Sequence, residues 1–299
     1  MSFNPRRIAL FALIALCLRF GSLAYAGSAT DVTGLYYTGH DSSGALATGG
    51  AQDANWTVTY ARVNGTGSTS SVYTGAAYVL SSAYIDPAYV ANTSSAKWIT
   101  APGASTAATG GTINAGGDYL PGNGTSGTNS AYYVYRLAFT VVGTGTGTAT
   151  NNIQISMTIA ADDRYTVYVN PASAPTVSNA GTISAGGTTA SASGTNAWNN
   201  TTSFTLGNST AGGGTNNSTY VIGTNYIYVV VANTNSQTGS IGSNALNPSG
   251  LLVYQVGSGI TIDGKVIPEV GTWMPVVAAL GVFGWRRFRR KSDDAASVG

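Results

Sequence analysis

Cysteine is nearly absent from this sequence of 299 residues. The single cysteine, Cys17, lies in an apolar segment close to the N-terminus. Intrachain disulfides are therefore excluded, and the shortage argues against a zinc or Cys–His site in the rest of the chain. Stability must come from a hydrophobic core, and a body of about 240 residues is long enough to form one.

Side chains that carry catalysis are also scarce. Histidine and glutamate occur once each, as His40 and Glu269. A Ser-His-Asp triad would have to use His40, and a glycosidase pair would have to be drawn from the Asp residues. There is no Gly-x-Ser-x-Gly motif, and no helical pattern follows the Gly-rich run 143–147. We therefore expect a protein that is not an enzyme.

Charged residues make up only 8% of the chain, and the formal net charge is +2. That positive charge comes from the two ends. Between Gly27 and Gly264 there are four basic and eight acidic residues, a formal charge of −4. Because nucleic-acid binding requires clustered Lys and Arg, this body is not expected to bind nucleic acid.

Residues 1–26 have the pattern of a secretory signal peptide. Two arginines precede an apolar segment, and Ala24 and Ala26 occupy the small-residue positions of a cleavage site. We expect signal peptidase to cleave after Ala26 and to leave Gly27 as the first residue.

The segment 265–291 combines a short motif, an apolar run and a basic cluster. In order, these are Ile267-Pro268-Glu269, residues 273–285, and Arg286, Arg287, Arg289, Arg290 and Lys291. The basic cluster should stay cytoplasmic. A helix over the apolar run would be about 20 Å long, against a hydrocarbon core of about 30 Å. A short, transient transmembrane helix fits better than a permanent span, and an ordinary single-span anchor is the alternative.

This tail resembles the PEP-CTERM sorting signal of Gram-negative bacteria, with Val270 in the place of the second proline. The resemblance implies recognition by an exosortase, cleavage near the motif, and release to the cell surface or extracellular matrix. Residues 292–299 would then be a disordered tail.

The body, 27–264, alternates apolar and polar residues with the period of two that is typical of strands. Helical periodicity is absent, so we predict one all-β domain, a jelly-roll-like β-sandwich. We also expect a hairpin loop at 143–147 and a long loop at 171–200. The expected strands are 34–38, 55–63, 72–80, 131–142, 152–160, 165–169, 202–206, 225–232, 250–256 and 259–262.

Six short motifs of the body carry a second resemblance. They are Leu35–Asp41, Asp53–Val58, Lys97–Ile99, Asp162–Asn170, Gly223–Val229 and Asn247–Leu251. Together they resemble the body common in exported PEP-CTERM proteins, which is similar to galactose-binding-like jelly rolls. Similar folds bind sugars, although a fold alone does not determine function.

Three tryptophans in the body are candidates for stacking on sugar rings. Trp98 and Trp198 adjoin or lie within predicted loops, so of the three they are the candidates for exposure and ligand binding. The alternative is that they lie in the core, where aromatics are more often found. Trp56 alternates within a predicted strand, and we expect it in the core because large aromatics bury much apolar area.

Asp162 and Asp163 form the densest acidic cluster of the body, and Asn170-Pro171 follows the next strand. Two interpretations remain open. Asp and Asn commonly stabilise turns, so the pair would form a turn or a buried polar contact within the fold. Alternatively, oxygen ligands of this kind would bind a structural calcium ion. No other cofactor is expected.

These observations predict an exported cell-surface or matrix protein whose β-sandwich associates with extracellular polysaccharide. Its partners during export would be signal peptidase and an exosortase, with a transient stage in the inner membrane. A structural or self-assembling matrix protein is the second hypothesis, and a matrix-acting enzyme is the third.

Overall fold

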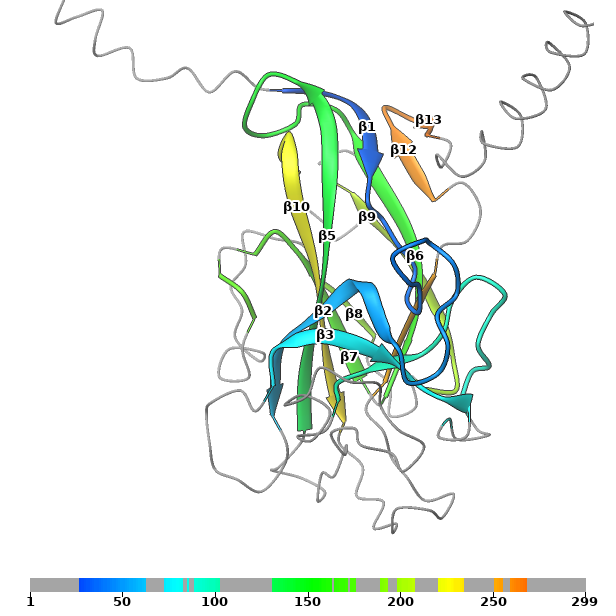
Figure 1. Ribbon diagram of the computed structural model, residues 1–299. Helices are drawn as coiled ribbons and strands as arrows, with labels where there is room; N and C mark the ends of the chain where they lie inside the picture. Colours follow the sequence, from blue (N-terminus) through cyan, green and yellow to red (C-terminus); the bar gives the residue numbers. More distant parts are fainter. Residues whose placement is uncertain are drawn as a thin grey trace, which may run out of the picture.

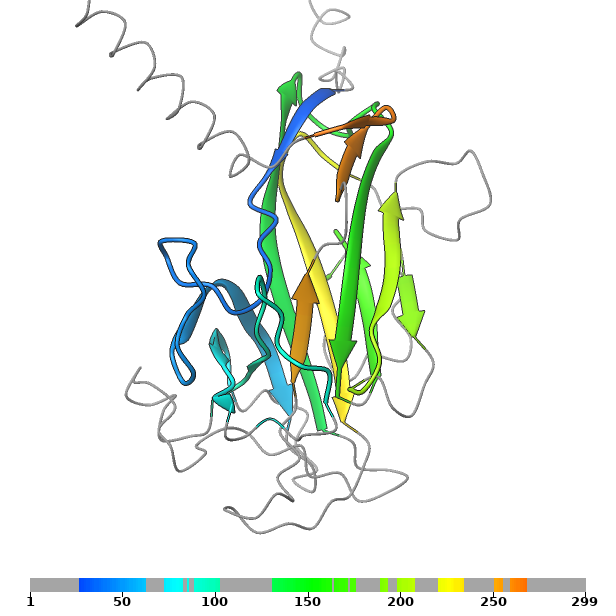
Figure 2. The same cartoon turned by 90° about the vertical axis from the view of Figure 1, so that its right-hand side faces the viewer.

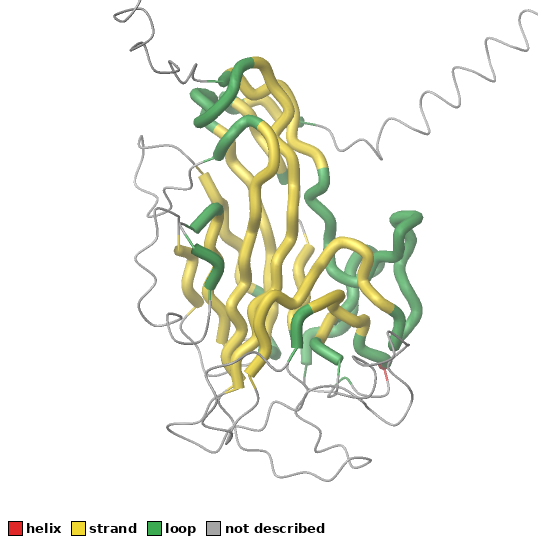
Figure 3. The backbone as a smooth tube through the Cα atoms, turned by 60° about the vertical axis from the view of Figure 1, so that its left-hand side comes forward, coloured by secondary structure: helices red, strands yellow, loops and turns green. Residues whose placement is uncertain are grey.

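The computed structural model describes residues 27–62, 73–82, 85, 89–102, 131–162, 164–171, 173–175, 189–192, 198–207, 220–233, 250–254 and 259–267. Strands make up most of the described backbone, and no α-helix occurs in it (Figure 3). The strands are β1 (Ser28–Thr33), β2 (Gln52–Arg62), β3 (Gly75–Val79), β4 (Ile99–Thr100), β5 (Ala131–Thr144), β6 (Ile153–Ala161), β7 (Arg164–Val169), β8 (Thr189–Ala192), β9 (Thr202–Gly207), β10 (Gly223–Asn233), β11 (Leu251–Tyr254), β12 (Ile260–Ile262) and β13 (Lys265–Val266).

Hydrogen bonds link all of these strands into one antiparallel sheet, which confirms the all-β prediction. The order is β13-β12-β6-β11-β4-β3-β2-β5-β10-β7-β8, with β1 also beside β5 and β9 also beside β6. The long strands β5, β6 and β10 run the length of the molecule (Figure 1), and β2 and β3 lie toward one end (Figure 2).

The sheet folds over so that β5, β10 and β7 face β6 and its neighbours across one hydrophobic core. Ring contacts cross between the two layers. The rings of Tyr165 on β7 and Phe204 on β9 stack at 6.5 Å, and Phe139 on β5 meets Tyr220 edge-on at 6.1 Å. The arrangement is sandwich-like, and strand β2 with the short strands β3 and β4 connects its two layers.

Alternation along β5 and β6 explains why these strands face one another. The inward positions of β5 are almost completely buried and belong to the same core as the inward positions of β6. These residues are Tyr133, Tyr135, Leu137, Phe139 and Val141 on β5, with Ile153, Ile155, Met157 and Ile159 on β6. The predicted core position of Trp56, which is fully buried, is confirmed.

The run 143–147 includes the end of β5 and the start of its connection to β6, residues 145–152, but the prediction of a hairpin there is wrong. Strand β5 pairs with β1, β2 and β10, whereas β6 pairs with β9, β11 and β12. Both strands carry apolar inward faces that need burial, and they bury them against each other from opposite layers rather than side by side. The connection therefore crosses between layers.

The predicted strand 34–38 is also wrong. Gly34 has a φ of 82°, so the chain turns away directly after β1. It then crosses to β11, where the Thr38 N–H donates to the Val253 carbonyl at 3.0 Å and the Val253 N–H donates to Thr38 Oγ1 at 3.0 Å. Sequence periodicity also missed β1, β4, β8 and β13, and the last three of these have four residues or fewer.

The sheet continues past residue 264, into the segment that the sequence assigns to the sorting signal. Asp263 and Gly264 both have positive φ, 50° and 76°, as a two-residue hairpin turn requires. Strand β13 then returns beside β12, and the Ile267 N–H donates to the Ile260 carbonyl at 2.9 Å. The folded body therefore reaches Ile267.

A buried carboxylate connects the loop after β1 to strand β2. Asp53 is 2% exposed and accepts backbone N–H groups from Gly39 at 2.5 Å, Asn55 at 2.8 Å and Trp56 at 2.9 Å. Burial raises the pKa of this carboxyl, and the backbone donors oppose that effect. The side chain thus replaces the sheet hydrogen bonds that the irregular start of β2 lacks.

Replacing Asp53 with Ala should destabilise the protein, because three backbone N–H groups would lose their acceptor. We expect the free energy of unfolding to fall by about 2–4 kcal/mol in chemical denaturation. Asp41→Ala is the matched control, since Asp41 makes similar bonds to Ser43 and Ala45 in an exposed turn where water can replace it. Equal destabilisation by both substitutions would contradict this role for Asp53.

Candidate functional site

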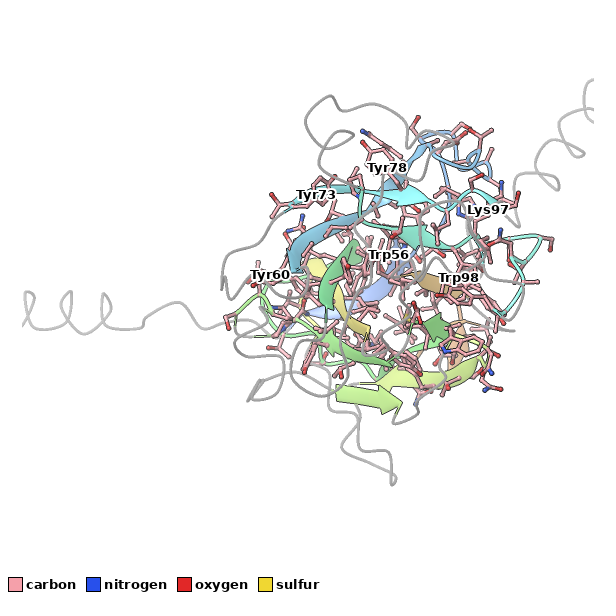
Figure 4. All side chains as sticks on the ribbon, turned by 90° about the horizontal axis from the view of Figure 1, so that it is seen from below. Trp56, Tyr60, Tyr73, Tyr78, Lys97 and Trp98 are labelled. Atoms are coloured by element: carbon pink, nitrogen blue, oxygen red, sulfur yellow. The ribbon has the colours of Figure 1, made fainter. Side chains whose placement is uncertain are left out.

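A second, smaller hydrophobic cluster lies on the outer face of the layer that contains β6 and β11. Leu252 on β11 is directly opposite Ala160 on β6. Their chain neighbours point into the main core, so these two side chains point outward, away from it. Leu80, Ala96 and Trp98 complete the buried part of the cluster. The end-on view in Figure 4 separates Trp98, at the side of the molecule, from Trp56 near its centre.

Trp98 is fully buried, so the prediction that it is exposed is wrong. Its indole N–H donates to the Val90 carbonyl at 2.7 Å, and its backbone N–H donates to Asn92 Oδ1 at 2.9 Å. Gly250 allows the indole to approach the backbone, because a Cβ at that position would lie 2.8 Å from a ring carbon of Trp98. The indole is a structural anchor and presents no free face to a ligand.

Trp198, the other predicted ligand residue, is half-buried and packs against the same cluster. Tyr89 joins the two tryptophans, with its ring centroid 5.0 Å from that of Trp98 and 5.6 Å from that of Trp198. The Val90 N–H also donates to the Trp198 carbonyl at 2.8 Å. The structure therefore brings together two residues that are 100 positions apart in the sequence, through a tyrosine that no sequence pattern indicated.

The rim of this aromatic cluster is partly polar. Asn199 and Asn200 follow Trp198 and are both exposed, and the Asn200 side-chain amide donates to the side-chain oxygen of Asn199. Tyr37 and Tyr254 are half-buried and pack against the cluster. Part-exposed rings beside amide groups offer flat apolar surface for stacking together with hydrogen-bonding groups.

Asp162 is 1% exposed at the end of β6, and its backbone N–H donates to the Gly250 carbonyl at 3.1 Å. It lies close to Tyr133, whose pKa is raised well above its usual value mainly by burial and further by Tyr135 and Asp162. Asp163 lies outside the described residues. Among the described residues, no group of three or more His, Cys, Asp or Glu side chains is placed to hold a metal ion.

Asn170, the other oxygen donor considered for calcium, stands at the far end of β7 from Asp162. With six strand residues between the two, they are about 20 Å apart. Asn170 adopts a φ of 45°, its side-chain amide donates to Asn225 Oδ1 at 2.7 Å, and its oxygen accepts the Tyr226 N–H at 2.8 Å. Asn170 therefore stabilises a turn, and the structure does not bring it to Asp162.

The predicted processing sites lie at the limits of the described residues. Gly27 is buried, its N–H donates to the Thr148 carbonyl at 3.1 Å, and a Cβ there would overlap Ile222. Ala24, Ala26, Pro268, Glu269 and the basic cluster lie outside the described residues. The part of the chain that the structure describes holds no helix long and apolar enough to cross a membrane, and the apolar run 273–285 is not in that part.

Comparison with known proteins identifies no relative of this chain. No family model, no curated protein and no solved structure matches this chain.

The close contact between Gly250 and Trp98 leads to a prediction. Gly250→Ala should push the indole away and lower the free energy of unfolding by about 1–3 kcal/mol, as overpacking does. In a Trp98→Ala background the same substitution should cost much less, because the clash is then absent. Chemical denaturation of the four members of this cycle measures the coupling, and additive effects would contradict the contact.

Proposed function

We propose that this chain is an exported protein whose β-sandwich associates with extracellular polysaccharide through the aromatic cluster around Trp198. The observation that supports the proposal is the state of Trp198. It is a partly exposed indole, held against Tyr89 at 5.6 Å and fixed through its carbonyl by Val90, with two exposed asparagines beside it. A ring that is fixed before binding loses little conformational entropy when a sugar stacks on it.

The fixed position of Trp198 depends on the buried part of the cluster. Trp98 occupies the space left by Gly250 in a cluster that includes Ala160, and the ring of Tyr89 lies against Trp98. In this proposal Trp98 acts by positioning Tyr89 and Trp198, and only Trp198 and the rim touch the sugar. The body would then be a sugar-binding jelly roll, similar to galactose-binding folds.

In this proposal the N-terminal signal peptide and the C-terminal sorting signal together direct the protein to the cell surface or matrix. Gly27, which directly follows the predicted cleavage site, is part of the fold, and an α-amino group produced by cleavage would keep the hydrogen bond to Thr148. Ile267, the first residue of the Pro-Glu motif, also bonds to the sheet. Export, exosortase sorting and release to the cell surface or matrix are therefore compatible with an intact fold.

A second candidate function is a structural role in the matrix, and the outer face of β6 and β9 favours it. Hydroxyl groups pair across these strands, Thr158 with Ser203 at 2.8 Å and Ser156 with Thr205 at 3.2 Å. Such a flat polar face, next to a strand that in the described sheet pairs on one side only, suits lateral contacts between copies.

Substituting Trp198 tests polysaccharide association. Trp198→Ala in the full chain should reduce retention on an immobilised polysaccharide about tenfold, in line with the roughly 1–2 kcal/mol that an aromatic contact contributes. Thr205→Ala, an exposed substitution farther along the same outer face and outside the tryptophan cluster, is the control. No retention of the wild-type chain on any polysaccharide would refute binding and leave the structural candidate.

The proposed processing of the two termini can be tested directly. Mass spectrometry of the protein from its native cells should find Gly27 at the N-terminus and a C-terminus close to the Pro-Glu motif, without the basic cluster. A C-terminus that retains Arg286 to Lys291 would contradict sorting and favour a permanent anchor.

A further inference from the structure

We propose a second ligand site on the opposite layer, where Arg136 and Tyr226 would bind the carboxylate and the ring of an acidic sugar. The surface involved is the outer face of β2, β5, β10 and β7, called here the tyrosine face. It consists of Asn55, Thr57, Tyr60, Val134, Arg136, Tyr168, Tyr226, Tyr228 and Val230. The proposal rests on the proposed function in taking a saccharide as ligand, but it uses none of the residues of the Trp198 cluster.

Strand register places four of these residues in one row across four strands. Thr57 pairs with Arg136, Arg136 with Tyr228, and Tyr228 with Tyr168. Their chain neighbours belong to the main core, so this row points away from it. In Figure 4, Tyr60 and Trp98 lie on opposite sides of the molecule, which separates the tyrosine face from the tryptophan cluster.

Most side chains of the tyrosine face are buried. Tyr60, Tyr168 and Tyr228 are each less than a tenth exposed, and burial raises the pKa of the Tyr168 hydroxyl. Arg136 and Tyr226 are part-exposed, as are Asn55 and Thr57 on β2. The guanidinium carbon of Arg136 lies 5.3 Å from the centre of the Tyr226 ring, so the ring holds the cation on one side.

The Nε atom of the Arg136 guanidinium has no acceptor in the described part of the protein. Arg136 Nε is buried and makes no hydrogen bond, and the same is true of Asn55 Nδ2. Asn55 lies two residues before Thr57 on the same side of β2, a diagonal separation of about 7 Å from Arg136. Buried donors without acceptors are costly. The Arg136 side chain as a whole is part-exposed, so a ligand that draws the guanidinium outward would supply the missing acceptor.

The chemistry of these groups identifies the ligand. A guanidinium presents parallel N–H bonds that match the two oxygens of a carboxylate, and its charge favours an anion. The ring of Tyr226 supplies a flat apolar surface for a sugar face. A uronic acid combines both features in one residue, whereas a neutral sugar leaves the cation unmatched.

Calorimetric titration of the full chain with tetragalacturonate tests the site. The neutral control is α-1,4-linked galactotetraose, which has the same rings and linkage without carboxylates, and sulfated galactotetraose distinguishes a carboxylate from another anion. We expect tetragalacturonate to bind at least tenfold more tightly than either control. Equal binding of the neutral sugar, tighter binding of the sulfated one, or no binding at all would overturn the proposal.

Variants locate the site. Arg136→Gln should weaken tetragalacturonate binding at least tenfold, and Tyr226→Ala should weaken it while Tyr226→Phe keeps it. Lys265→Gln is the charge-matched control, since Lys265 is exposed on β13, and it should have no effect. An equal loss in Lys265→Gln and Arg136→Gln would show non-specific charge attraction and overturn the proposal. Melting temperatures within a few degrees of wild type show that the variants are folded.

Trp198→Ala separates this site from the proposed function. Unchanged tetragalacturonate binding in Trp198→Ala supports an independent site at Arg136, whatever the retention assay shows for other polysaccharides. Loss of tetragalacturonate binding in Trp198→Ala together with full binding in Arg136→Gln would assign the acidic sugar to the tryptophan cluster and overturn the second site.

Discussion

The packing of β5 against β6 is the contact on which the rest of the structure depends. Strand β5 has 14 residues and pairs with three others, with β1 and β2 on one edge and β10 on the other. Its inward face meets the inward face of β6, and this burial is the main source of stability in a chain whose one cysteine lies outside the body. Because both strands use only every second residue for this contact, each leaves an outward face. Both proposed ligand sites lie on such outward faces.

The outward faces are unusual because they are not simply polar. A strand on the surface of a sandwich usually exposes polar residues on its outer face. Here Val134, Tyr168 and Tyr228 are buried on one outer face, and Leu252 and Trp98 on the other. The two layers therefore have apolar residues on both sides, which explains why small clusters form beyond the main core. Part-exposed rings at the margins of these clusters, Tyr226 and Trp198, are natural contact points for flat ligands.

The strand content was predictable because alternation is a local property. Segments such as 131–142 and 152–160 alternate over many residues, and they correspond to β5 and β6 to within two residues. What alternation cannot show is which strands pair, so the connection at 143–147 was predicted as a hairpin although it crosses between layers. Strands of two to four residues, such as β4 and β13, are too short to show a period. Their positions depend on partners that are distant in sequence.

The candidate site was predictable only in part, and for the same reason. Loop sequences around Trp98 and Trp198 resemble each other in polarity, so composition assigned both to the surface. Burial of Trp98 depends on Gly250, which leaves space for the indole and lies 152 positions away, and on a cluster that includes Ala160, 62 positions away. The role of Tyr89 likewise depends on two distant rings. Arg136 stood in a strand pattern and gave no signal, since an unpaired donor is visible only when its surroundings are known.

The scarcity of charge determines how this body satisfies its polar groups, and that scarcity makes Arg136 significant. Buried polar side chains, either neutral or carrying one charge, make hydrogen bonds directly to the backbone. Asn225 is fully buried, accepts the Val221 N–H at 2.9 Å and donates to the carbonyls of Val221 and Gly223, both at 2.8 Å. Asp53 bonds backbone donors in the same way. In a chain that satisfies many buried groups so locally, the buried Arg136 N–H without an acceptor is an exception, together with Asn55 Nδ2, Asn152 Oδ1 and Thr261 Oγ1. Such exceptions are expected where a ligand, rather than the chain, completes the hydrogen bonds.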